Sequence, residues 1–199
     1  MLTATFLAFL STLAMARVDN ELKQPHKDRY VLHNQCLVGL QRQIDEEMHA
    51  SLTYMSMAAH FGNNDIARQG FSKFFSENSK EEKEHAEKII DYINKRGGKV
   101  SSFDIKMPTK DTWQNGLEAL EDALNLEKRV NNKLYHLHDL AEKVCLDPHL
   151  MDFVEEEYLN EQVESIDKLS RYISMLRAMD SGMGEYLIDQ ELLGKKVEL

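Results

Sequence analysis

The chain has 199 residues, a hydrophobic fraction of 42% and a formal net charge of −10, from 34 acidic and 24 basic side chains. These values fit one ordered domain with a well-filled core, and they exclude a disordered chain. The negative charge argues against binding nucleic acid through a phosphate-neutralising surface and agrees better with the binding of cations.

The first segment, residues 1–16, reads MLTATFLAFLSTLAMA and carries no charged side chain. It ends in Ala14-Met15-Ala16, a small-x-small cleavage pattern, and therefore predicts a secretory signal peptide. No other run approaches about 20 apolar residues, so no membrane span is expected. Residues 17–33 are polar and are expected to form an extended N-terminal arm.

Cys36 and Cys145 are too few for a disulfide scaffold. In an oxidising compartment they could pair once within or between chains, and two free thiols are an equal alternative. The chain ends in KVEL, residues 196–199, which resembles the K-D-E-L retrieval signal with valine in place of its acid. We therefore expect a secretory or extracellular protein, with retention in the endoplasmic reticulum as the alternative.

Beyond the arm, four long segments and a short fifth one show apolar residues at helical spacing: 34–61, 66–96, 112–143, 147–179 and 183–193. Asp65 is predicted to cap the second helix, and Gly97-Gly98 to end it. Asp147 followed by Pro148 predicts the start of the fourth helix, because proline is favoured just after an acidic cap.

The connections between these segments predict the topology. The first and second helices, and the third and fourth, are joined by short turns that make antiparallel hairpins. The second and third are joined by about fourteen residues, 98–111, long enough to run along the bundle. An all-α, ferritin-like bundle with one long crossover is therefore predicted for residues 34–199, and an up-down-up-down bundle with a disordered loop is the alternative.

Each long helix has an apolar stripe that is interrupted midway by a carboxylate or an amide: Glu47, Glu82, Glu127 and Gln162. Burying an unpaired ionised carboxylate costs several kcal/mol, and three such groups would also repel one another. No lysine or arginine lies on these stripes at the same level. A bound metal cation is the predicted source of compensating charge.

The spacing of these groups allows them to meet. At about 1.5 Å per residue, both partners in each hairpin lie about 24 Å from their turn. Glu82 and His85 are three apart and share a face of their helix. With Glu47 and Glu127 they offer three carboxylates and one imidazole, a set that suits iron or manganese rather than structural zinc. Three carboxylates exceed the needs of one divalent ion, so two ions with a bridging carboxylate are favoured.

These residues lie in motifs that resemble ferritin of the heavy-chain, ferroxidase-bearing type, in particular invertebrate subunits of the secretory pathway. The motifs are QRQIDEEMHASLTYMSMAAHF, SKEEKEHAEKIIDYINKRGGK, GLEALEDALNLEKRVN, DPHLMDFVEEEYLNEQV and GEYLIDQELLG. The similarity covers roughly residues 34–194. It implies that Glu47, Glu82 and His85 bind a first iron, and that Glu82 bridges to a second iron held by Glu127.

The resemblance also implies roles for two neighbours of the iron ligands. Gln162 would orient ligands and water by hydrogen bonds, and Tyr54 would lie beside the centre. The implied reaction is oxidation of two Fe(II) by dioxygen, followed by mineralisation inside a shell of twenty-four subunits, built from this chain alone or with other ferritin subunits. The alternative is a non-catalytic structural subunit of a mixed shell. A signalling four-helix protein would have an apolar core throughout, and a small di-iron oxygenase would need more chain around its substrate.

Two further sets of acids carry over from the resemblance. Asp152 and Glu155 match acids that line the iron channels at three-fold axes, although first-turn acids are also ordinary helix-dipole partners. Met151 stands where many members of the family have cysteine. A second set on the second helix could nucleate mineral or form a solvated face: Glu81, Glu84 and Glu87.

Overall fold

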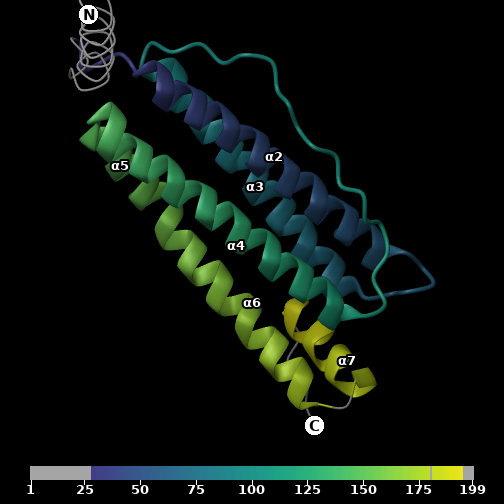
Figure 1. Cartoon of the computed structure of the whole chain (residues 1–199). Coiled ribbons are helices and arrows are strands. Elements are labelled where there is room, and N and C mark those ends of the chain that lie inside the picture. The colour runs from purple at the N-terminus through teal and green to yellow at the C-terminus, as the bar shows by residue number, and fades with distance from the viewer. Residues whose placement is uncertain (1–27, 180, 195–199) are drawn as a thin grey trace, which may run out of the picture.

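The computed structural model of the chain describes residues 28–179 and 181–194, and all regular structure in these ranges is helical (Figure 1). The predictions for residues 1–27 and 196–199 lie outside the described residues. The elements are α2 (Asn34–Gly62), α3 (Gln69–Lys95), α4 (Gly116–Leu140), η1 (Ala141–Cys145), α5 (Pro148–Val154), η2 (Glu155–Leu159), α6 (Asn160–Ala178) and α7 (Ser181–Leu192). The predicted all-α bundle with a short fifth helix is confirmed. Two π-helical turns are present: η1 extends α4, and η2 joins α5 to α6.

The crossover between α3 and α4 runs along α2 and decides the topology (Figure 1). Its backbone is held by side chains of α2, with Ser101 N donating to Gln41 Oε1 and Asp104 N donating to Asp45 Oδ1, both at 3.0 Å. Because the crossover spans the length of the bundle, α4 starts at the same end as α3. A Cβ on Gly116 would lie 2.5 Å from the Phe71 ring. The predicted ferritin-like arrangement is confirmed, and the alternative with a disordered loop is wrong.

Two of the predicted helix boundaries hold. Gly97 follows α3 with φ of 69°, a left-handed conformation that glycine adopts without a steric penalty. Asp147 precedes α5, its side chain accepts a hydrogen bond from Leu150 N at 3.1 Å, and Pro148 occupies the first turn.

The predicted cap of the second helix by Asp65 is wrong. The first-turn N–H groups of Gly70 and Phe71 instead donate to Asp189 Oδ1, at 2.7 and 3.1 Å. A Cβ on Gly70 would lie 1.8 Å from the Asp189 carbonyl oxygen, so only glycine permits this approach. The cap of α3 therefore comes from α7, which is distant in the sequence.

A second carboxylate of α7 binds the starts of two helices. Glu185 Oε1 accepts from Arg68 Nε at 2.7 Å, and its Oε2 accepts from Gly116 N at 2.8 Å. Helix N-termini carry free N–H groups and partial positive charge, which stabilise nearby anions. Asp189 and Glu185 together fix α7 against the end of the bundle where α3 and α4 begin.

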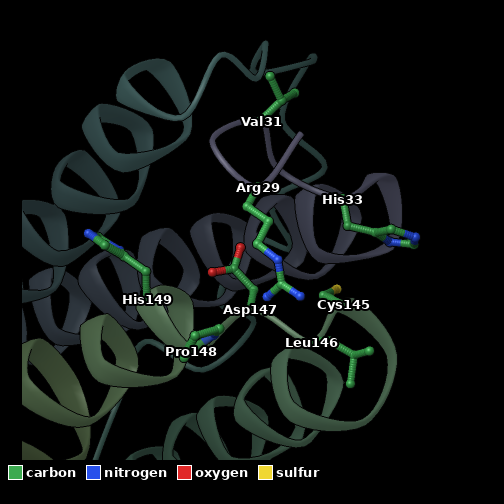
Figure 2. A pocket seen from close by; sticks show the side chains of 8 residues that line it. All are labelled: Arg29, Val31, His33, Cys145, Leu146, Asp147, Pro148 and His149. Atoms are coloured by element: carbon green, nitrogen blue, oxygen red, sulfur yellow. The ribbon is translucent and has the colours of Figure 1, made fainter. Parts of the chain in front are cut away.

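The opposite end of the bundle is held by covalent and ionic links. Cys36 in α2 and Cys145 in η1 form a disulfide with Cα atoms 6.3 Å apart, so the cysteines pair within the chain. Buried Arg96 donates to Asp147 Oδ2 at 2.7 Å. Figure 2 shows Arg29 reaching from the arm toward Asp147 and Cys145, in a pocket of about 150 Å³. The described part of the arm therefore closes this end.

An aromatic layer fills the core between the middle of the bundle and α7. Phe61 and Phe71 stack with ring centroids 5.1 Å apart, and Phe75 stacks on Tyr54 at 6.0 Å. Each ring is fully buried or nearly so, which contributes about 1.5–3 kcal/mol per side chain. This layer reaches the polar groups at mid-height of the bundle through Tyr54, whose hydroxyl donates to Glu127.

Candidate metal centre

The four polar interruptions of the apolar stripes come together inside the bundle. Glu47, Glu82, Glu127 and Gln162 project from α2, α3, α4 and α6, and their exposed fractions are 0%, 4%, 2% and 4%. His85, one turn after Glu82, is 7% exposed. Carboxylates are rarely buried this completely without a partner cation, which identifies this level of the bundle as a candidate site.

Three of these residues form a compact set of ligand atoms. One atom each from Glu47, Glu82 and His85 lie within 4.8 Å of one another. The Oε2 atoms of Glu47 and Glu82 are buried and have no hydrogen-bond partner. Buried acceptors are normally paired, so these two oxygens lack the hydrogen-bond donor or cation that a buried carboxylate oxygen usually has. A metal cation among them would satisfy both.

Glu127 faces the same centre from α4 and is held by two donors. Tyr54 donates its hydroxyl proton to Glu127 Oε1, and Gln162 Nε2 donates to Glu127 Oε2 at 2.6 Å. Hydrogen bonds to a charged acceptor are stronger than neutral ones, so these donors restrict the carboxylate to one orientation. The structure thus places both predicted neighbours, Tyr54 and Gln162, in contact with a predicted ligand.

Electrostatics make the centre a strong acceptor of positive charge. Burial raises the pKa of Glu47 and of Glu82 well above the usual range, and neighbouring carboxylates raise both further. Burial also raises the pKa of Glu127. Burial and mutual repulsion therefore disfavour the charged form of these carboxylates, and a metal cation would compete with protons for the same oxygens.

Sequence reasoning missed three groups that contact the ligands. Gln43 Nε2 donates to Glu47 Oε1 at 2.8 Å, Tyr158 donates its hydroxyl proton to the His85 carbonyl at 3.0 Å, and Glu161 Oε2 lies 3.1 Å from His85 Nε2. Gln43 could have been found from its spacing of four residues before Glu47. The other two contacts join α3 to η2 and α6, and no local pattern indicates them.

Comparison with known proteins shows the family of this chain. The family profile of the ferritin-like domain matches residues 38–179. The chain is 52% identical over 166 residues to the ferritin middle subunit of Salmo salar, covering 81% of this chain and 93% of that protein. This chain belongs to the ferritin family. It is also 47% identical to the ferritin lower subunit of Aquarana catesbeiana, covering 83% and 97%, and 48% identical to soma ferritin of Lymnaea stagnalis, covering 81% and 92%.

Membership of the ferritin family makes the chain a subunit for iron storage, in a family that assembles into shells. Iron is therefore the metal that the centre has to suit. Carboxylate oxygens and one imidazole nitrogen are donors that bind iron well, and the centre contains no thiolate. Each described helix is too short or too polar to cross a membrane.

The predicted channel acids of this ferritin lie away from the metal centre. Asp152 in α5 and Glu155 in η2 are both exposed, and Glu155 Oε1 lies 2.6 Å from His138 Nε2. Met151 is half-buried and packs against the core. A channel at a three-fold axis is formed by three subunits, so the role of these acids stays a prediction.

All three predicted nucleation acids of the ferritin lie at exposed positions of α3. Glu84 and Glu87 are exposed on α3, and Glu87 pairs with Lys83 at 2.5 Å. Glu81 and Glu161 line a cavity between α3 and α6. The pKa of Glu81 is raised mainly by burial and further by the negative charge of Glu161. Of the three, Glu81 is the acid that lines this cavity, and the nucleation role of all three stays a prediction.

Proposed function

We propose that this chain is a catalytic ferritin subunit that oxidises Fe(II) with dioxygen at a two-iron centre. The ferric product is then stored as mineral inside a shell of twenty-four subunits. The observation that carries this proposal is the buried cluster of Glu47, Glu82 and His85, with Glu127 facing it from α4. A subunit with a purely structural role has no need for three buried carboxylates at one level of its core.

The resemblance to heavy-chain ferritin implies how the ligands would divide between two irons. Glu47, Glu82 and His85 would hold the first ion and Glu127 the second, with Glu82 shared between them. The two hydrogen bonds that Glu127 accepts, from Tyr54 and from an amide, support this assignment because they fix the carboxylate before iron arrives. Such pre-arranged ligands bind metal at a lower entropic cost.

The chemistry balances with two irons and one dioxygen. Each Fe(II) loses one electron and becomes Fe(III), and these two electrons, with two protons, would convert one dioxygen to hydrogen peroxide. The clustered carboxylates favour this change, because anionic ligands stabilise a trivalent ion more than a divalent one. The protein's part is to hold both ions and to fix the Glu127 carboxylate through the hydrogen bonds from Tyr54 and Gln162.

The decisive test is aerobic Fe(II) oxidation by purified shells. Glu82→Ala and His85→Ala are expected to abolish the rapid phase, with shells that still elute at full size on gel filtration. Glu77→Ala is the matched control, because Glu77 is exposed on the same helix and pairs weakly with Lys73 at 3.9 Å. Rapid oxidation by both site variants would refute the assignment. Absence of rapid oxidation in the unaltered shell would favour the structural-subunit alternative.

We also propose that the chain matures in the secretory pathway. Two observations support this: the apolar segment over residues 1–16, and the Cys36–Cys145 disulfide, which forms in oxidising compartments. Expression in animal cells should yield a protein that begins at Arg17. Deletion of residues 196–199 should increase its secretion if KVEL acts as a retrieval signal, and should leave secretion unchanged if it does not.

A further inference from the structure

We infer that Glu161 is a positioning residue that orients the His85 ring toward iron. This inference rests on the proposed two-iron centre. The two ring nitrogens of His85 face different carboxylates: Nδ1 lies 3.6 Å from Glu82 Oε2 inside the metal cluster, and Nε2 lies 3.1 Å from Glu161 Oε2. In this orientation Nδ1 can bind a metal ion, and Nε2 contacts the protein through Glu161.

The chemistry of imidazole explains why the second contact matters. A neutral imidazole binds a metal through the lone pair of one nitrogen, while the other nitrogen carries the hydrogen. When Nε2–H donates to Glu161, the lone pair of Nδ1 points at Glu82 and the cluster. The carboxylate also makes the imidazole a better donor to the metal, as outer partners of metal-binding histidines commonly do.

Two residues one turn apart at the junction of η2 and α6 hold the backbone and the ring of His85. Tyr158 donates its hydroxyl proton to the His85 carbonyl at 3.0 Å, and its ring meets the imidazole edge-on at a centroid distance of 5.3 Å. One turn later, Glu161 holds the ring nitrogen. Lys88 pairs with Glu157 at 3.1 Å and links the same two segments of chain. His85 is thus fixed at its backbone and at its ring by residues of the fourth long helix.

The side chain of Glu161 is 40% exposed, whereas that of His85 is 9% exposed. Glu161 can therefore be replaced without opening a cavity in the core, and its variants are expected to fold and assemble. Two other roles would predict different results. Glu161 could attract cations by its charge alone, or it could bind the metal directly. Neither of those roles requires His85.

The test is titration of metal-free shells with Co(II), a probe that binds without being oxidised by the centre, followed by its visible absorption. Comparison of the unaltered protein with His85→Ala identifies the part of Co(II) binding that needs His85. Glu161→Ala is expected to weaken this part by about 10–100-fold. Glu161→Gln is expected to retain most of this binding, because its amide oxygen still accepts from Nε2–H. Glu164→Ala, an exposed acid on the same helix, is the matched control and should bind Co(II) normally.

The double variant His85→Ala/Glu161→Ala separates positioning from the other roles. If Glu161 acts through His85, adding Glu161→Ala to His85→Ala causes no further loss. A further loss, or equal losses in Glu161→Gln and Glu161→Ala, would overturn the inference. Normal binding by Glu161→Ala, with a clear loss in His85→Ala, would also overturn it and leave the two-iron centre standing. If His85→Ala itself had no effect, the proposed centre would fail.

Discussion

Replacement of Asp189 by alanine should detach α7 from the start of α3. Asp189 is 4% exposed, and its carboxylate accepts hydrogen bonds from Gly70 N and Phe71 N at 2.7 and 3.1 Å. Each buried N–H left without an acceptor costs about 1–3 kcal/mol, and loss of the anion at a helix start adds about 0.3–1 kcal/mol. We expect a total loss of about 2–7 kcal/mol in the free energy of unfolding.

The loss can be measured by calorimetry of assembled, metal-free shells. For a chain of this size a loss of 1 kcal/mol lowers the unfolding midpoint by about 2–4 °C, so Asp189→Ala should lower it by about 4–28 °C. Asp189→Asn keeps one acceptor oxygen and should lose much less. Glu191→Ala, an exposed acid on the same helix, is the control. A midpoint for Asp189→Ala equal to that of Glu191→Ala would refute the reasoning that α7 caps α3.

Three further predictions concern the metal centre, the disulfide and the docking of α7. Glu82→Gln should raise the unfolding midpoint of metal-free shells, and more so at higher pH. The pKa of Glu82 is raised in the folded state, so the protein loses stability as the pH rises above the ordinary pKa of 4.5. Glutamine does not ionise and removes this loss. An equal effect of the variant at pH 4 and pH 8 would contradict this prediction. Cys36→Ser should reduce the free energy of unfolding by about 4–5 kcal/mol, because the disulfide closes a loop across a sequence separation of 109. Reductant should destabilise the unaltered protein but not this variant. Gly70→Ala should lower the midpoint by several degrees, since its Cβ would meet the Asp189 carbonyl oxygen at 1.8 Å, and Gly182→Ala, with open space around it, should not.

Much of the metal centre was accessible from periodicity alone. Glu47, Glu82 and Glu127 stand where each helix should present an apolar side chain, and a buried carboxylate has a cost that must be offset. Helical phase and equal depth from the turns then bring these groups to one level. The same argument could not reach Glu161 or Tyr158, because a contact between η2 or α6 and α3 depends on how the two hairpins align.

Residues 34–199, taken as sequence, determined the number of long helices, their polarity pattern and the identity of the buried acids. These features depend on local spacing, which is set by the geometry of the α-helix. The tertiary structure decided which groups satisfy one another. Asp189 rather than Asp65 caps α3, Cys36 bonds to Cys145, and Glu161 holds the far nitrogen of His85. Each of these contacts joins residues far apart in the chain, so they form only when the packing of the bundle brings their helices together.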